Sequence, residues 1–246
     1  MTTPTHRFPP PAFSKRILII VGGYGSGKSE VSVNLARFLA ASPGRTVAIA
    51  DLDVVNPYFR SREAGKQLQA LGIKPLNPRG ALEHADLPII LPEVKGAIEN
   101  SDDTLILDVG GDDVGARVVG SLTDVMPVDD YELFLVLNAN RPFTSTVDNC
   151  RQLMRSIEVA GRLHFTGIIS NTHMLEYTTA DTVRDGLVLA RALSEDTGLP
   201  IVFVSALEEQ LENIKQEELE FPVLPLHRLL LKPWERSAVR PGGKNR

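Results

Sequence analysis

The chain has 246 residues, of which 43% are hydrophobic and 23% charged, a balance typical of a soluble globular protein. Its formal net charge of −5 argues against general nucleic-acid binding, which depends on many contacts from Lys and Arg to phosphates. Its one cysteine, Cys150, excludes an internal disulfide and favours a reducing, cytoplasmic setting, and no apolar run approaches the roughly 20 residues of a membrane-spanning helix.

The predicted elements begin after a Pro-rich stretch. Residues 1–14 lack the apolar core of a signal peptide, and we expect them to form a disordered leader. Beyond them, short apolar runs alternate with amphipathic helical patterns. The apolar runs cover residues 16–20, 46–50, 104–109, 132–138, 165–170 and 200–205. The helical patterns that separate some of these runs cover residues 28–42, 144–161 and 179–198.

The apolar runs are continuous rather than alternating, which predicts strands buried on both faces of a parallel sheet. Helices between such strands predict right-handed crossovers. We therefore expect an α/β fold, with an open, mostly parallel sheet and helices on both faces, in three layers. We expect one domain over residues 15–222, with an acidic helical segment at 206–220, and a C-terminal extension over 223–246.

The octapeptide GGYGSGKS, residues 22–29, follows the first predicted strand and matches the P-loop pattern G-x-x-x-x-G-K-[ST]. Glycines let successive backbone N–H groups turn toward phosphate oxygens, and the helix that follows offers its positive N-terminal end. Lys28 is placed to reach the β- and γ-phosphates, and the Ser29 hydroxyl to ligate Mg²⁺. The predicted nucleotide-binding residues of the loop are Gly22, Gly23, Gly25, Ser26, Gly27, Lys28 and Ser29.

A carboxylate closes the apolar run at 104–109. Asp108 fits the Walker B pattern, in which a buried strand delivers an aspartate to the metal and its water shell. The glycines after it, Gly111 included, allow a backbone N–H to approach the γ-phosphate. We therefore expect Asp108 to be a catalytic and metal-binding residue and Gly111 to bind nucleotide.

Two more carboxylates, Asp51 and Asp53, end the run at 46–50, and their spacing puts them on opposite faces if the strand continues. With the P-loop and Asp108, this D-x-D pair resembles the MinD/ParA/CobQ-type branch of P-loop NTPases over roughly residues 15–205. The resemblance implies that Asp53 orients the attacking water and that Asp51 supports Mg²⁺. The sequence leaves open which aspartate has which role.

One position departs from that family. MinD and ParA proteins carry a lysine early in the loop that reaches the partner's nucleotide across a dimer, and Gly23 stands at the matching position here. The departure puts the dimer in doubt, unless another residue supplies the charge. Arg60 and Arg62 are the obvious substitutes, in a segment where Asn56 and Pro57 also fit an ordinary helix start.

Two further segments bear on regulation and on the choice of base. Asp112 and Asp113 follow the Walker B strand, where they fit either a switch segment or a solvated helix start. Asn171 ends the run at 165–170, where related proteins contact the purine. The residues after it, Thr172-His173-Met174, lack the Lys and Asp of a guanine-reading loop, which favours ATP over GTP.

The function expected from these residues is an ATP- and Mg²⁺-dependent ATPase that acts as a nucleotide-dependent switch on a protein partner or as a homodimer. Two alternatives stay open. The first is a small-molecule kinase or ligase that resembles dethiobiotin synthetase, which an acceptor pocket at the carboxyl edge of the sheet would favour. The second is a nucleotide-gated binding protein with negligible turnover. A flat apolar face beside the P-loop would favour the dimerising switch.

Overall fold

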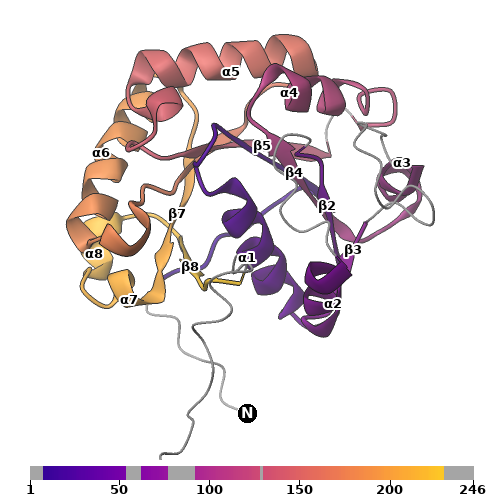
Figure 1. The fold of residues 1–246 in the computed structure, drawn as a ribbon, viewed down its shortest axis with the longest axis horizontal. Coiled ribbons are helices and arrows are strands. Elements are labelled where there is room, and N and C mark those ends of the chain that lie inside the picture. Colours follow the sequence, from indigo (N-terminus) through magenta and orange to yellow (C-terminus); the bar gives the residue numbers. More distant parts are fainter. Residues whose placement is uncertain (1–7, 54–61, 77–91, 128–129, 230–246) are drawn as a thin grey trace, which may run out of the picture.

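The structure is a computed structural model, and it describes residues 8–53, 62–76, 92–127 and 130–229. Within these ranges a parallel sheet of eight strands has the order β3-β2-β4-β1-β5-β6-β7-β8 (Figure 1). The strands are β1 (Ile17–Gly22), β2 (Val47–Asp51), β3 (Ile73–Pro75), β4 (Thr104–Gly110), β5 (Tyr131–Leu137), β6 (Gly167–Ser170), β7 (Ile201–Leu207) and β8 (Val223–Leu226).

Helices cover both faces of this sheet (Figure 1). The α-helices are α1 (Lys28–Ala40), α2 (Arg62–Ala70), α3 (Pro92–Asn100), α4 (Asp113–Gly120), α5 (Val147–Gly161), α6 (Ala180–Thr197), α7 (Glu208–Leu211) and α8 (Gln216–Leu219). Two short 3₁₀ turns, η2 (Pro142–Thr144) and η3 (Leu175–Tyr177), follow β5 and β6. This three-layer α/β/α arrangement confirms the predicted fold class.

The central strand β1 shows how the continuous apolar runs produce three layers. Ile17, Ile19 and Val21 pack into one core, which also holds buried residues of α3, α4, α5 and α6. Leu18 and Ile20 point the other way, into a second core with α1 and α2. Because successive side chains of a strand alternate between faces, a strand with helices on both sides is apolar at nearly every position.

The six predicted strands are all present, and two edge strands were not predicted. These are β3 and β8, which are short and contain Pro75 and Pro225. Proline lacks a donor for the strand ladder and is tolerated at sheet edges, so neither segment carries a strong strand pattern. β8 extends the sheet with residues 223–226, which the sequence had suggested as the start of a C-terminal extension.

Two segments differ from their predicted form. The acidic segment at 206–220 is not one helix, because β7 runs to Leu207 and two four-residue helices, α7 and α8, follow. Residues 8–14 of the expected disordered leader contact the body. Phe8 is buried, and the Phe13 ring lies 5.9 Å from that of Phe134 and 6.2 Å from that of Phe203, between ring centroids. The large apolar side chains hold this part of the leader in place.

The end of the described chain lies against the helix that follows the P-loop. The backbone N–H of His227 donates to Asn34 Oδ1 (2.9 Å), and that of Leu229 donates to Glu30 Oε1 (2.8 Å).

None of the helices in the described ranges combines the length and apolar character needed to cross a bilayer.

Candidate nucleotide-binding site

The P-loop connects β1 to α1 at the carboxyl edge of the sheet. Gly25 and Gly27 have φ values of +74° and +85°, in the left-handed region that favours glycine. A Cβ atom at Gly27 would lie 2.5 Å from Asn171 Nδ2, so this glycine is also required for packing. The loop therefore brings its backbone N–H groups and the N-terminus of α1 to one place, which is a ready anion site.

The predicted lysine and carboxylates converge on this loop. The Lys28 Nζ atom lies 2.5 Å from Asp53 Oδ2, and both side chains are largely buried. The backbone N–H of Asp53 donates to Asp51 Oδ1 (3.1 Å). In the sheet register, Asp108 on β4 stands beside Ile20 of β1 and Asp51 of β2. The structure thus places all three aspartates at the strand ends next to Lys28.

The charges of these residues are coupled. Burial raises the pKa of the Asp108 carboxyl to about 7, and Asp51 and Asp53 add to the rise, whereas Lys28 and Ser29 oppose it. Burial by itself would lower the pKa of Lys28, but the charge of Asp108 and the contacts with Asp53 hold it above its usual value. Lys28 is therefore a fixed cation facing a surplus of negative charge.

This surplus fits a bound metal. Both carboxylate oxygens of Asp108 are buried without a well-oriented hydrogen-bond donor among the described residues, and so is the Ser26 hydroxyl. Within these residues, no three His, Cys, Asp or Glu side chains form a metal cage by themselves. Mg²⁺ does not need one, because it binds through one or two carboxylates, waters and substrate phosphates. The residues present fit a magnesium nucleotide, which Ser29 and Asp108 would contact.

The segment after Asp108 is packed directly on the P-loop. A Cβ atom at Gly111 would lie 2.1 Å from the carbonyl oxygen of Gly22, so only glycine fits there. Asp112 caps α4, and its Oδ1 accepts from the backbone N–H of Gly115 at 2.8 Å. Asp112 thus forms a helix start, one of its two predicted roles, and this start is in contact with the nucleotide loop.

Asn171, which follows β6, contacts the backbone of the P-loop. Its Nδ2 donates to the carbonyl of Ser26 (2.8 Å), and its Oδ1 accepts from the Ser205 hydroxyl (2.9 Å). His173 also lies against the loop, since a Cβ at Gly27 would be 3.0 Å from its Nε2. Burial lowers the pKa of His173 to about 4, with the Arg141 charge contributing. Asn171 therefore braces the loop, and its contact with a purine stays a prediction.

The residues suggested as substitutes for the early loop lysine are not placed by the structure. Arg60 lies outside the described ranges, and for Arg62 only the backbone, at the start of α2, is described. The structure instead brings Arg141 to the loop, where its Nε donates to the carbonyl of Gly25 (3.0 Å). The sequence signal for Arg141 is only its place just after a predicted strand, at the edge where ligands bind.

Several large apolar side chains are exposed in segments at the carboxyl edge of the sheet, where the P-loop also lies, and the sequence pattern did not indicate them. Tyr24 of the loop is 72% exposed, and Phe143 of η2, 57% exposed, lies over Gly23. Further large apolar residues are exposed after β6 and at the start of α4. The residues of this apolar patch are Tyr24, Val114, Phe143, Met174, Leu175 and Tyr177. Val114 belongs to the first turn of α4, and the others come from loops and 3₁₀ turns that follow β1, β5 and β6, all after the carboxyl ends of the strands.

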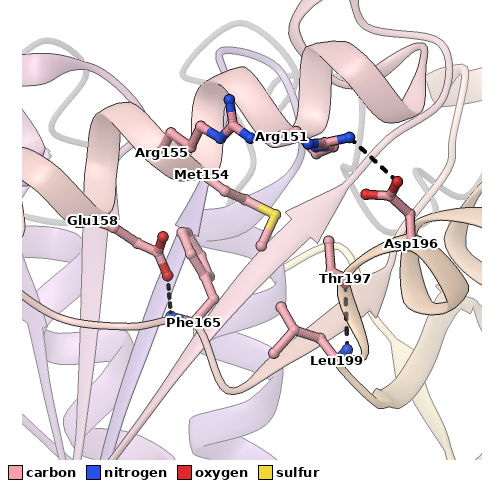
Figure 2. Close-up of a pocket in the computed structure, with 8 residues that line it drawn as sticks. All are labelled: Arg151, Met154, Arg155, Glu158, Phe165, Asp196, Thr197 and Leu199. Atoms are coloured by element: carbon pink, nitrogen blue, oxygen red, sulfur yellow. Dashed lines mark hydrogen bonds and ion pairs between the residues drawn. The ribbon is translucent and has the colours of Figure 1, made fainter.

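A separate groove lies between α5 and the end of α6, with a volume of about 330 Å³. Figure 2 shows Met154, Phe165 and Leu199 pointing into it, with Arg151 paired to Asp196 at its rim (3.3 Å). Phe165 precedes β6 and Leu199 precedes β7, so this groove is at the amino edge of the sheet, away from the P-loop.

The parallel sheet, the loop between β1 and α1, and the aspartates on the neighbouring strand ends define a P-loop NTPase fold. No protein-family model matches the chain. It is similar to the solved cell-division protein FtsY of Thermotoga maritima, at 23% identity and a TM-score of 0.51 over 81% of this chain and 64% of that one. Similarity to FtsY of Elizabethkingia anophelis reaches a TM-score of 0.51 at 18% identity, over 83% of this chain and 60% of the other.

Two curated proteins are similar over different lengths. The cytosolic Fe-S cluster assembly factor NUBP1 homolog of Caenorhabditis elegans is 50% identical over 42 residues, 17% of this chain and 13% of that protein. The signal recognition particle 54 kDa protein of Methanopyrus kandleri is 25% identical over 204 residues, 78% of this chain and 39% of that protein. The chain thus spans well under half of these relatives. The comparisons support the P-loop NTPase class without selecting the MinD/ParA/CobQ branch, which stays a prediction.

Proposed function

We propose that the protein binds a nucleoside triphosphate with Mg²⁺ and hydrolyses it. The observation that carries this proposal is the convergence of Lys28, Asp53 and Asp108 on the P-loop, with the buried carboxylate of Asp108 lacking a well-oriented hydrogen-bond donor among the described residues. When bound, Mg²⁺ neutralises charge on the phosphates. The Ser29 hydroxyl and Asp108 hold it, and Asp51 supports it through the neighbouring strand end.

Lys28 and Asp53 have linked roles in this proposal. In the structure Lys28 is paired with Asp53, although a P-loop uses this lysine to bind phosphate. Phosphate oxygens compete for the ammonium, so nucleotide binding loosens the pair and frees the Asp53 carboxylate to orient the attacking water. Hydrolysis is thereby coupled to occupancy of the loop, because the contact between Lys28 and Asp53 weakens when the lysine binds another anion.

We further propose that the nucleotide is ATP. The support is the sequence Asn171-Thr172-His173-Met174 after β6, which lacks the Lys and Asp that read guanine. The Thr172 hydroxyl accepts from the backbone N–H of Ala139 (3.0 Å), so it is already engaged in holding the neighbouring loop. Direct comparison of ATP and GTP tests this assignment.

The apolar patch at the carboxyl edge supports a switch that acts on a protein surface, either a partner or a second copy. Exposed apolar side chains that gather at one place mark interaction sites. Contact between Gly111 and Gly22 links the start of α4, where Val114 is exposed, to the nucleotide loop. A change in loop occupancy would therefore reach the patch directly, as in switches that order a segment around the γ-phosphate.

The test is phosphate release from purified protein with ATP or GTP and Mg²⁺, with mass followed by light scattering. Lys28→Ala and Asp53→Asn should each lower turnover at least about tenfold, whereas Lys95→Ala, which removes only an ion pair with Asp124 at the surface, should not. Turnover that needs an added small-molecule acceptor would favour the kinase or ligase alternative. Tight binding without turnover would favour the nucleotide-gated binding protein.

A further inference from the structure

Arg141 lies against the nucleotide loop without belonging to any P-loop signature. Its Nε donates to the carbonyl of Gly25 at 3.0 Å. A Cβ atom at Gly25 would lie 2.9 Å from this Nε and 3.3 Å from the guanidinium carbon. The guanidinium is therefore packed on the backbone of the loop, at the glycine whose left-handed φ turns the chain around the phosphate site.

Several hydrogen bonds hold the turn that carries Arg141. The buried Thr144 hydroxyl donates to the carbonyl of Asn138 (2.7 Å), and the backbone N–H of Arg141 donates to the same carbonyl (3.0 Å). The backbone N–H of Thr144 returns a bond to the carbonyl of Arg141 (3.0 Å). Asn138 and Thr144 are fully buried at the end of β5, next to β1. The sheet thus fixes the position of Arg141 relative to the loop.

The Arg141 guanidinium makes no ion pair among the described residues, although its charge helps to lower the pKa of the nearby His173. A guanidinium has five N–H donors, and the contact with Gly25 uses one of them. Among the described residues its two terminal nitrogens make no hydrogen bond and no ion pair, and the side chain is only half-exposed. An arginine in this state has donors available for an anion, and its planar fork matches phosphate oxygens.

We propose that Arg141 donates to the β- and γ-phosphate oxygens of the nucleotide in the P-loop and stabilises the charge that develops there during hydrolysis. This inference rests on the proposed function. Water oxygen bonds to the γ-phosphorus, and the bond from that phosphorus to the bridging oxygen breaks. The bonding electrons stay on the diphosphate, and the attacking water releases one proton to the solvent. Arg141 transfers no proton and acts as a hydrogen-bond donor to the oxygens that gain charge.

The competing explanation is that Arg141 only braces the loop through Gly25. The two roles differ in what they do to each nucleotide. A brace supports the loop for diphosphate and triphosphate alike and contributes to stability without ligand. A phosphate donor acts mainly when the γ-phosphate is present, and most strongly in the transition state.

The experiment compares wild type, Arg141→Ala and Arg141→Lys, with Arg155→Ala as the matched control. Arg155 is an exposed arginine of α5 at the groove on the opposite edge, with no ion pair among the described residues. Dissociation constants for the di- and triphosphate, the melting temperature without nucleotide and kcat for phosphate release are measured on each protein.

In Arg141→Ala we expect kcat to fall about 100-fold or more, the triphosphate to lose its affinity advantage over the diphosphate, and the ligand-free melting temperature to stay at the wild-type value. Arg141→Lys keeps the positive charge but lacks the planar guanidinium, so its kcat should lie between those of wild type and Arg141→Ala. Added guanidinium should partly restore the kcat of Arg141→Ala. Arg155→Ala should match wild type.

Equal loss of di- and triphosphate affinity with unchanged kcat, or a lowered melting temperature alone, would overturn the inference in favour of a brace. A wild-type protein that binds neither nucleotide would overturn this inference and the proposed function together, whereas normal turnover in Arg141→Ala would overturn this inference alone.

Discussion

The ammonium of Lys28 lies 2.5 Å from the carboxylate of Asp53. In the proposed reaction these two groups have separate partners, because Lys28 binds phosphate and Asp53 orients the attacking water. The pair is largely buried, with side-chain exposures of 11% and 5%. Each partner therefore stabilises the charge of the other in the absence of an anion. In the proposed function, nucleotide phosphates offer Lys28 a different partner, so the Asp53 carboxylate would compete with phosphate for the lysine.

Asp53→Asn should separate binding from hydrolysis. Without the carboxylate, Lys28 has less competition for phosphate, so we expect triphosphate affinity to hold or rise while phosphate release falls at least about tenfold. Because Asp51 and Asp108 remain to balance Lys28, the ligand-free stability should fall by less than the roughly 3–5 kcal/mol of a buried pair whose remaining charge is left alone. Calorimetric binding, phosphate release and urea unfolding check these three outcomes. Weaker triphosphate binding would contradict the competition between Asp53 and phosphate.

Gly111→Ala should disrupt the contact between the Walker B segment and the P-loop. Its added methyl would meet the carbonyl of Gly22 at 2.1 Å, backbone that cannot move aside easily, and we expect a loss of roughly 1–3 kcal/mol together with weaker nucleotide binding. Gly96→Ala is the control, because nothing lies within 4 Å of a Cβ there. As a helical glycine replaced by alanine, Gly96 should give a gain of roughly 0.5–1 kcal/mol. Equal stabilities of the two variants would contradict the close approach of Gly111 to the loop.

His173→Gln should flatten the response of stability to acid. Burial and the Arg141 charge lower the pKa of His173 to about 4, below its ordinary value of 6.5. Between these values the unfolded chain binds a proton that the folded protein does not, so the free energy of unfolding falls as the pH drops from about 6.5 to 4. The variant should lose part of that fall, as measured by urea unfolding at several pH values.

The matched control is His164→Gln, because the His164 side chain is 88% exposed and lies at the amino edge. This variant should keep the wild-type dependence of stability on pH. If both histidine variants show the same slope as wild type, then His173 is not held in its neutral form behind the P-loop.

Tyr177→Asp should reduce association at the apolar patch without harming the fold. Tyr177 is 73% exposed, so the added charge costs the isolated chain little, whereas a charge at a dehydrated contact is strongly unfavourable. We expect the mass increase with triphosphate and Mg²⁺ to disappear in light scattering while the melting temperature stays unchanged. Val159→Asp, at an 80% exposed position of α5, should keep the mass increase. Loss of association in both variants would place the contact elsewhere.

The sequence by itself determined the elements whose signal is local. The P-loop needs its glycines, Lys28 and Ser29 at fixed spacing, and Asp108 needs a buried strand before it, so both appear in a short stretch of residues. Strands covered on both faces are apolar at nearly every position, which made six of the strands predictable. The edge strands β3 and β8 were not, because an edge tolerates proline and needs only a few residues.

Only the tertiary structure decided which distant residues support the loop. Asn171 reaches the carbonyl of Ser26 across 145 positions, and Arg141 reaches that of Gly25 across 116. Neither contact leaves a pattern in the residues nearby, because it depends on the order in which β1, β5 and β6 lie in the sheet. The same order places the segments that carry the exposed apolar residues at one edge of the sheet. Site residues that are neighbours in the chain can be recognised from a short sequence pattern. Site residues from different strand ends come together only when the strands pair in the sheet, so no local pattern predicts them.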